Sequence, residues 1–337
     1  MDNTLVMENS RAMSKARLIN YVLFLFIIFS VFFGLLYYFA ISPDKIFYSI
    51  VPVSASKTKA PTFDFAIYGE GENKIVTPMD LAVDGKRVFV SDADANKVWI
   101  YDSNGKYKHS FGKAGSGNGE FNFPYGIALD NRGRVFVADM KNHRVQLFDI
   151  QGQFLSLFPN KDAKTLFNYP GGVAVVNNLV YITDIYKNKV FVFDLDGKKV
   201  LEFGTYGSDA GQFKYPNGVT ADSKGNIYVS DSGNNRVQVF GKDGRFQREI
   251  TGATIQGVEE HYASPRGVAV LNDEFLFVVS NMSSQVWASD LKGRLYYRFG
   301  ERGEENNQFS FPYGIEINQN KLFVADYQNH GIKVFKY

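Results

Sequence analysis

Residues 215–240 read YPNGVTADSKGNIYVSDSGNNRVQVF and contain one unit of a pattern that recurs along the chain. Valine, isoleucine and alanine alternate with other residues in three short runs, at 219–221, 227–229 and 237–239. Alternation with a period of two predicts β-strands, because successive side chains of a strand point to opposite faces. Glycine and asparagine between the runs favour tight turns, since both tolerate positive φ. The unit therefore predicts an antiparallel meander.

The unit recurs with a nearly constant period. A proline opens each copy, and these prolines are Pro78, Pro124, Pro170, Pro216, Pro265 and Pro312. The intervals between them are 46, 46, 46, 49 and 47 residues. A period of this length that carries strands and no helix pattern is typical of a β-propeller with four strands in each blade.

Most copies share P-x-G, an apolar strand, a second strand ending in Asp, a short polar turn with Asn, and a third strand that starts at a basic residue. This pattern resembles the NHL repeat, and the resemblance covers about residues 63–337. It implies an all-β fold, a six-bladed β-propeller of four-stranded antiparallel blades. It does not specify a function, because propellers carry unrelated activities.

The two ends of the repeated region are complementary. Residues 63–71, FDFAIYGEG, are similar to the last strand of other copies, such as residues 296–301, YYRFGE, whereas the sixth copy supplies three strands. We therefore expect the N-terminal strand to complete the last blade as its outer strand. This closure removes the open sheet edge that would otherwise remain at the seam.

The segment before the propeller is apolar. Residues 18–41 carry no formal charge, and a helix of that length spans roughly 36 Å, enough to cross a bilayer core. Basic residues precede it at Arg11, Lys15 and Arg17, which places residues 1–17 in the cytoplasm by the positive-inside rule. The sequence thus predicts a single-pass cell-membrane protein with a signal anchor, a linker at 42–61 and an extracytoplasmic propeller at 62–337. A cleaved signal peptide is the alternative, although its apolar region is usually only about 7–15 residues long.

Composition limits the partners that we expect. The chain has no cysteine, so disulfides cannot stabilise the fold. Its formal net charge is +2, which gives no global basic field of the kind that nucleic-acid-binding proteins use. We expect integral association with the membrane through one helix, and no nucleic-acid partner.

A column of aspartates ends the second strand of five copies, and its members are Asp92, Asp139, Asp184, Asp231 and Asp326. Ser280 replaces aspartate in the fifth copy. Because each member precedes the same polar turn, we interpret the column as turn-capping groups that accept backbone N–H bonds, and not as a catalytic or metal site.

Two acidic residues depart from the repeat near the axis. Asp80 stands where five copies have the glycine of P-x-G, and Glu316 stands where the other copies have alanine or threonine. Copies one and six are neighbours in a closed ring, so we expect these carboxylates to lie close together. They are candidates for a divalent-cation site or a general acid. The alternative is that they are sequence variation without a function in a channel filled with water.

The residue between the proline and the glycine of P-x-G differs from copy to copy, whereas the motif around it recurs. It is Tyr125, Asn217, Arg266 and Tyr313 in four copies, and these positions should surround one mouth of the channel. Aromatic, amide and guanidinium side chains are suited to binding, so we expect a ligand-binding ring there.

Two functions follow from these features. The first is a recognition or scaffolding module for a protein, peptide or glycan ligand. The alternative is a propeller enzyme, a metal-assisted hydrolase or lyase similar to lactonases or amidating lyases, with a cation near the channel mouth. The sequence shows no nucleophile and base at a recognisable spacing, so it favours the binding module and predicts no catalytic residue.

Overall fold

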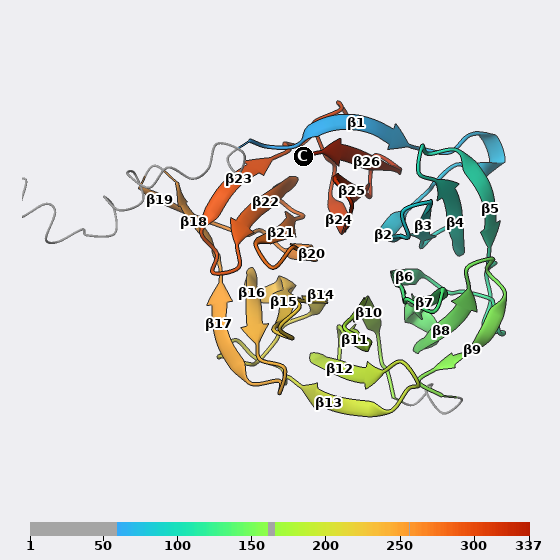
Figure 1. Ribbon diagram of the computed structural model, residues 1–337, viewed down its shortest axis with the longest axis horizontal. Helices are drawn as coiled ribbons and strands as arrows, with labels where there is room; N and C mark the ends of the chain where they lie inside the picture. The colour runs from blue at the N-terminus through green and yellow to red at the C-terminus, as the bar shows by residue number, and fades with distance from the viewer. Residues whose placement is uncertain (1–58, 161–165, 256) are drawn as a thin grey trace, which may run out of the picture. The chain divides into compact units, whose positions relative to one another are not determined.

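The computed structural model describes residues 59–160, 166–255 and 257–337. These residues form six four-stranded antiparallel sheets and one additional two-stranded sheet. The six sheets are the blades of a ring around a central axis (Figure 1). The predicted all-β, six-bladed propeller is therefore confirmed.

In five blades the strands are paired in chain order from the axis outward, and in the sixth β1 is the outermost strand. The innermost strand of each blade begins at the predicted proline. The first three blades are β2(Pro78–Val83), β3(Arg87–Asp92), β4(Lys97–Asp102), β5(Tyr107–Phe111); β6(Pro124–Leu129), β7(Arg134–Asp139), β8(Arg144–Asp149), β9(Phe154–Phe158); and β10(Pro170–Val176), β11(Leu179–Asp184), β12(Lys189–Asp194), β13(Lys199–Phe203). The last three are β14(Pro216–Ala221), β15(Ile227–Asp231), β16(Arg236–Phe240), β17(Phe246–Ile250); β20(Pro265–Leu271), β21(Phe275–Ser280), β22(Gln285–Asp290), β23(Leu295–Phe299); and β24(Pro312–Asn318), β25(Lys321–Asp326), β26(Gly331–Lys336), β1(Thr62–Ile67).

The hydrophobic core lies between neighbouring blades. One buried cluster joins Phe89 and Ile100 of the first blade to Val135 and Phe148 of the second. Because both faces of each blade are covered in this way, most side chains of the middle strands are apolar and buried, and their burial is the main favourable term in folding.

The aspartate column has the structural role that the sequence indicates. The Asp92 carboxylate accepts N–H bonds from Thr77 at 2.9 Å and from Ala95 at 3.2 Å. It thereby ties the turn after the second strand to the segment before the first strand. In the fifth blade the Ser280 hydroxyl accepts the corresponding bond, from the Ala263 N–H at 2.9 Å.

The ring closes as predicted, with β1 as the outer strand of the sixth blade. It pairs antiparallel with β26 from Thr62 opposite Lys336 to Ile67 opposite Ile332. Asp64 adds ion pairs to Lys321 and Lys336 across the seam.

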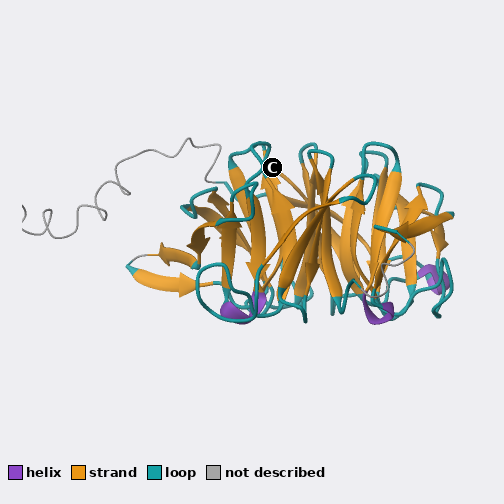
Figure 2. Cartoon of the chain, turned by 90° about the horizontal axis from the view of Figure 1, so that it is seen from below, coloured by secondary structure: helices purple, strands orange, loops and turns teal. Residues whose placement is uncertain are grey.

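The two faces of the ring differ. The short helices η1(Gly71–Asn73), η2(Met140–Asn142) and η4(Ser232–Asn234) lie on the lower face in Figure 2. The innermost strands begin on this face, and we call it the proline face. The hairpin of β18(Gly252–Ile255) and β19(Val258–His261) projects from the side of the ring (Figures 1 and 2).

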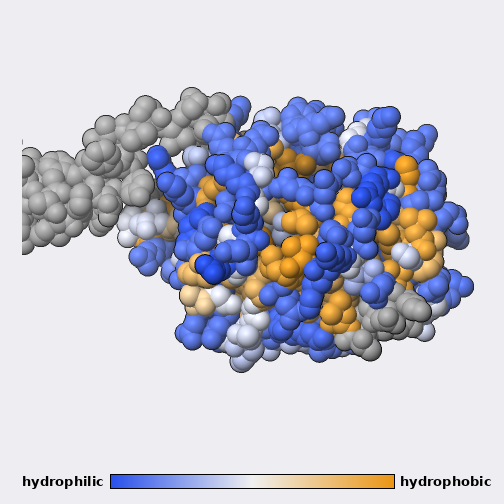
Figure 3. Space-filling model, turned by 60° about the horizontal axis from the view of Figure 1, so that its bottom comes forward, coloured by the Kyte–Doolittle hydropathy of each residue, from blue (hydrophilic) through white to orange (hydrophobic). Residues whose placement is uncertain are grey.

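The side of the ring seen in Figure 3 is mainly hydrophilic, with apolar patches between the hydrophilic side chains. Exposed apolar residues on the outer strands include Leu155 on β9 and Val200 on β13. These outer strands supply matched control positions for substitutions on the proline face.

The predicted transmembrane segment at 18–41, the tail at 1–17 and most of the linker at 42–61 lie outside the described residues. Within the described ranges, none of the helices has the length and apolar character needed to span a bilayer.

Candidate functional site

The six innermost strands enclose a cavity of about 300 Å³ on the axis of the ring. Most of its wall consists of glycine and short apolar side chains, such as Ala82, Val173 and Val268. The volume lies at the lower end of the range of small-molecule sites, which is about 300–1,000 Å³. The cavity can therefore hold a small ligand or several waters.

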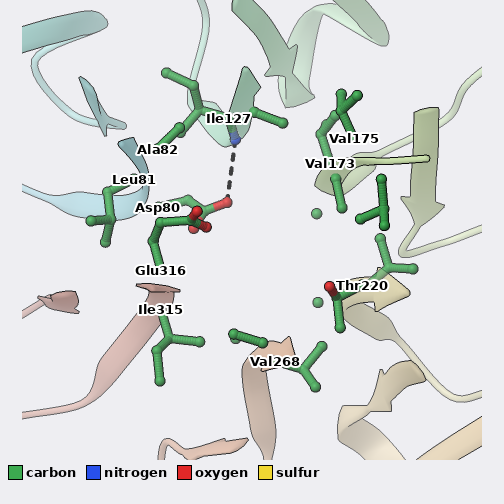
Figure 4. Close-up of a pocket in the computed structure, with 18 of the residues that line it drawn as sticks. Asp80, Leu81, Ala82, Ile127, Val173, Val175, Thr220, Val268, Ile315 and Glu316 are labelled. Atoms are coloured by element: carbon green, nitrogen blue, oxygen red, sulfur yellow. Dashed lines mark hydrogen bonds between the residues drawn. The ribbon is translucent and has the colours of Figure 1, made fainter. Parts of the chain in front are cut away.

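Asp80 of β2 and Glu316 of β24 both line this cavity, and their carboxyl groups lie next to one another (Figure 4). Thr220 of β14 faces them from the opposite wall. The structure thus brings together the two acidic departures from the repeat, although 235 residues separate them in the chain.

Asp80 is held by hydrogen bonds to its own blade and to the second blade. Its Oδ2 accepts a hydrogen bond from the Ile127 N–H of the second blade at 3.2 Å, and its own N–H donates to the Ser91 hydroxyl at 3.1 Å. On the other side, a Cβ at Gly314 would come within 2.4 Å of Asp80 Oδ1, so only glycine fits there.

Burial makes both acids weaker. It raises the pKa of Asp80 to about 7, against two opposing backbone hydrogen bonds. Burial, and secondarily the charge of Asp80, raises the pKa of Glu316 to about 8. At neutral pH the pair therefore retains at least part of one proton, and it can donate as well as accept hydrogen bonds.

A metal ion fits this pair poorly. Among the described residues there is no group of three or more His, Cys, Asp or Glu side chains that could hold a metal. Calcium takes six to eight oxygen ligands, and two carboxylates with one hydroxyl supply fewer. A cation bound here would need most of its ligands from water or from backbone carbonyls.

The four predicted mouth residues converge on the axis at the proline face. The Tyr125 hydroxyl donates to Asn217 Oδ1 at 2.8 Å, from the second blade to the fourth. The Tyr125 ring meets the Tyr313 ring edge-on at 6.3 Å between centroids, and the Arg266 guanidinium lies 5.1 Å from the Tyr313 centroid. We call these four residues the axial plug.

The side chains of the axial plug pack against one another across the axis. Tyr125 and Asn217 are buried, and Met79 of the first blade is buried in the same cluster as Tyr125. None of these side chains lines the cavity, whose wall begins at Asp80 and extends along the strands away from the proline face. The plug therefore separates the acidic cavity from the proline face, and a partner that approaches this face does not meet an open channel.

Two polar atoms in the axial plug have no partner. Asn217 Nδ2 and Arg266 Nε are both buried and form no hydrogen bond. A buried donor without an acceptor costs about 1–3 kcal/mol of stability, so this is an unusual feature for a region that only fills space.

An aromatic row that the sequence analysis missed runs beside the axial plug. The ring centroids of Tyr169 and Tyr186 are 4.4 Å apart, and the ring centroids of Tyr186 and Tyr215 are 6.1 Å apart. Tyr186 is 53% exposed and Tyr215 48%. We call these three residues the tyrosine row.

The sequence contains a weak indication of the tyrosine row. The residue before the repeat proline is aromatic in four copies, and these residues are Phe123, Tyr169, Tyr215 and Phe311. Comparison of that column across copies would have identified two of the three tyrosines. The third, Tyr186, comes from the turn after a column aspartate, and only packing brings it to the others.

Sequence comparison finds two matching families. Residues 213–240 match the NHL repeat, and residues 70–159 match a family described as a 6-bladed beta-propeller. Both matches agree with the observed fold, and the resemblance to the NHL repeat is confirmed at residues 213–240.

The relatives have different activities. The chain is 33% identical over 165 residues to the human E3 ubiquitin-protein ligase NHLRC1, and the alignment covers 48% of this chain and 38% of the ligase. It is 28% identical over 159 residues to a probable peptidyl-alpha-hydroxyglycine alpha-amidating lyase of Caenorhabditis elegans, pgal-1, covering 45% of this chain and 44% of the lyase. The chain thus matches less than half of the length of either relative.

A solved structure is similar over the whole ring. A gluconolactonase from Xanthomonas campestris aligns with a TM-score of 0.57 and 16% identity, covering 82% of this chain and 95% of the gluconolactonase. At this identity the likeness concerns the fold alone.

Proposed function

We propose that this NHL-repeat propeller is a recognition module that binds a protein or peptide ligand through its proline face. The tyrosine row is the observation that carries the proposal. Tyrosine is enriched at protein interfaces, because its ring buries a large apolar area while its hydroxyl keeps a hydrogen bond. Two half-exposed tyrosines side by side provide such an area at low entropic cost.

The scaffold beneath the tyrosine row favours tight binding. Tyr215 has a left-handed backbone with φ of 54°, and its N–H donates to Asn188 Oδ1 at 2.9 Å. On the turn that carries Tyr186, the Lys187 backbone N–H donates to Asp184 Oδ1 at 2.9 Å. A surface whose backbone is held in this way loses little freedom when a partner binds, which preserves affinity.

We further propose that residues 18–41 anchor the chain in the cell membrane and that the propeller is extracytoplasmic. The apolar run and the basic residues before it support this topology. A tethered recognition module would then present its ligand site outside the cytoplasm.

A peptide selection tests the recognition function. Random peptides displayed on phage are selected on the purified full chain, and their affinities are then measured for Tyr186→Ala with Tyr215→Ala. We expect the double variant to bind selected peptides at least about tenfold more weakly, because burial of a large side chain contributes about 1.5–3 kcal/mol. The control, Leu155→Ala with Val200→Ala on the outer strands, should bind like the wild type.

Two results would contradict the proposal. Selected peptides that bind both double variants equally would place the binding surface elsewhere. A glycan array that yields tyrosine-dependent binding, together with a failed peptide selection, would assign the face to a carbohydrate ligand.

The second candidate is a propeller enzyme that uses the axial cavity. The buried pair of Asp80 and Glu316 supports it, since a carboxyl group that keeps its proton near pH 7 can act as a general acid. If the pair holds a divalent cation, Ca²⁺ or Zn²⁺ should raise the melting temperature, and Asp80→Asn should abolish that shift. No metal-dependent shift in the wild type would contradict the metal-assisted form of this candidate.

A further inference from the structure

The axial plug contains a cation without a counter-ion. Among the described residues, no carboxylate forms an ion pair with Arg266, and no acceptor bonds to its buried Nε. The guanidinium lies over the face of the Tyr313 ring. A partly buried guanidinium normally pairs with a carboxylate or donates to carbonyl oxygens, because its charge is otherwise poorly solvated.

The nearby acids do not serve as that counter-ion. Asp80 and Glu316 line the axial cavity, whereas Arg266 does not, and neither carboxylate forms an ion pair with it. The positive charge of Arg266 acts instead on Tyr125, where it partly opposes the rise in pKa that burial causes. Arg266 therefore belongs to the proline side of the plug and not to the cavity.

Asn217 adds a second free donor next to Arg266. Only 3% of Asn217 is exposed, its Oδ1 accepts from Tyr125, and its Nδ2 has no partner. A Cβ at the following residue, Gly218, would lie 2.3 Å from the Arg266 carbonyl oxygen, so the fourth and fifth blades touch here. The two donors thus come from adjacent residues of neighbouring blades.

We propose that Arg266 and Asn217 bind the carboxylate of an aspartate or glutamate side chain of a peptide held on the proline face. This inference rests on the proposed recognition function and names the chemistry of the partner. A planar guanidinium matches a carboxylate with two parallel N–H bonds, and the Tyr313 ring holds the guanidinium in place. The Asn217 amide N–H is buried, so it reaches the carboxylate only when the plug side chains shift as the peptide binds.

The part of the proline face around the tyrosine row fits an acidic peptide, whereas several glutamates of this face lie in the loops before Pro78 and Pro312. Lys187 and Lys214 flank the tyrosine row, and their ammonium groups contact a carbonyl and a hydroxyl, the Leu166 carbonyl and Ser208. A peptide with acidic and aromatic residues would meet lysine and tyrosine there and would place one carboxylate at the axis. Charge complementarity of this kind favours the correct partner and speeds association.

The test uses the purified full chain and two capped octapeptides. One alternates glutamate with tyrosine, and the other replaces every glutamate with glutamine. We expect the acidic peptide to bind at least about tenfold more tightly than the glutamine peptide, as hydrogen bonds to charged groups allow. Arg266→Met should remove that preference, and Arg266→Lys should keep part of it.

A second variant separates binding from folding. Asn217→Asp places a carboxylate next to Arg266 within the chain, so we expect it to raise the melting temperature and to abolish binding of the acidic peptide. Arg266→Met should not lower the melting temperature, because it removes an unpaired charge. A structural role for Arg266 predicts the opposite result, a lower melting temperature.

The remaining outcomes overturn the inference. Equal binding of both octapeptides, or an unchanged preference in Arg266→Met, refutes a carboxylate site. If binding is equal but is lost with Tyr186→Ala and Tyr215→Ala, the recognition function stands without this site. Failure of both octapeptides and of the peptide selection removes both proposals, and tighter binding of a single-stranded oligonucleotide than of the acidic peptide would reassign the cation to phosphate.

Discussion

Replacing Glu316 with glutamine should make the stability of the propeller less dependent on pH. Glutamine keeps the shape of the side chain but cannot ionise. In the folded chain burial raises the pKa of Glu316 to about 8, and the ordinary value is 4.5. Between these values the unfolded chain has lost a proton that the folded chain retains. The free energy of unfolding of the wild type therefore falls as the pH rises through this window, and it levels off above pH 8.

The structure sets the size of the effect. One proton gives a slope of about 1.4 kcal/mol per pH unit, which would total at most about 5 kcal/mol across the window. Glu316 keeps some contact with the cavity, and water there weakens the penalty for its charge. We therefore expect roughly half of the maximum, about 2 kcal/mol, between pH 5 and pH 8.

Urea unfolding measures this difference. Trp99 and Trp287 are buried, so their fluorescence reports on unfolding. The free energy of Glu316→Gln minus that of the wild type should grow by about 2 kcal/mol from pH 5 to pH 8. Other carboxyl groups with raised pKa, such as Asp139 and Asp326, cancel because both proteins contain them.

A constant difference across this range would refute the reasoning, since it would mean that Glu316 ionises in the folded chain at its ordinary pH. A pH-independent cost of the amide does not affect the test, because only the change with pH is compared. Glu259→Gln, which changes an exposed glutamate, is the matched control and should give a flat difference.

Two further predictions concern the ends of the chain. A reporter fused after Tyr337 should be active only outside the cytoplasm, because basic residues precede the apolar run; activity in the cytoplasm would reverse the proposed topology. Deleting residues 1–72 removes β1 and exposes the edge of β26, so we expect aggregation and a lower melting temperature, measured by gel filtration and thermal unfolding. Deleting residues 1–58 leaves every described blade complete and should not lower the melting temperature; equal behaviour of the two truncations would show that β1 contributes nothing to closure.

The sequence by itself determined the architecture of the propeller. The spacing of the prolines gives the number of blades, and the similarity of residues 63–71 to other outer strands gives the closure by β1. The aspartate column and its serine replacement were also readable, because a group that recurs once in every blade at one turn reflects local backbone geometry. Such features depend on residues close in the chain, or on a frame that every copy shares.

Only the tertiary structure determined which side chains meet at the axis of the ring. Tyr125 and Asn217 are 92 residues apart, and no pattern in the repeat indicates that their side chains bond to each other. Closing six blades into a ring directs six variable residues toward one narrow axis, so large side chains there pack together and seal it. The same closure sets Asp80 against Glu316 in a confined cavity, where burial raises the pKa of both carboxyl groups. The repeat specifies where each inner strand begins, whereas the distance between side chains across the ring depends on the closed geometry.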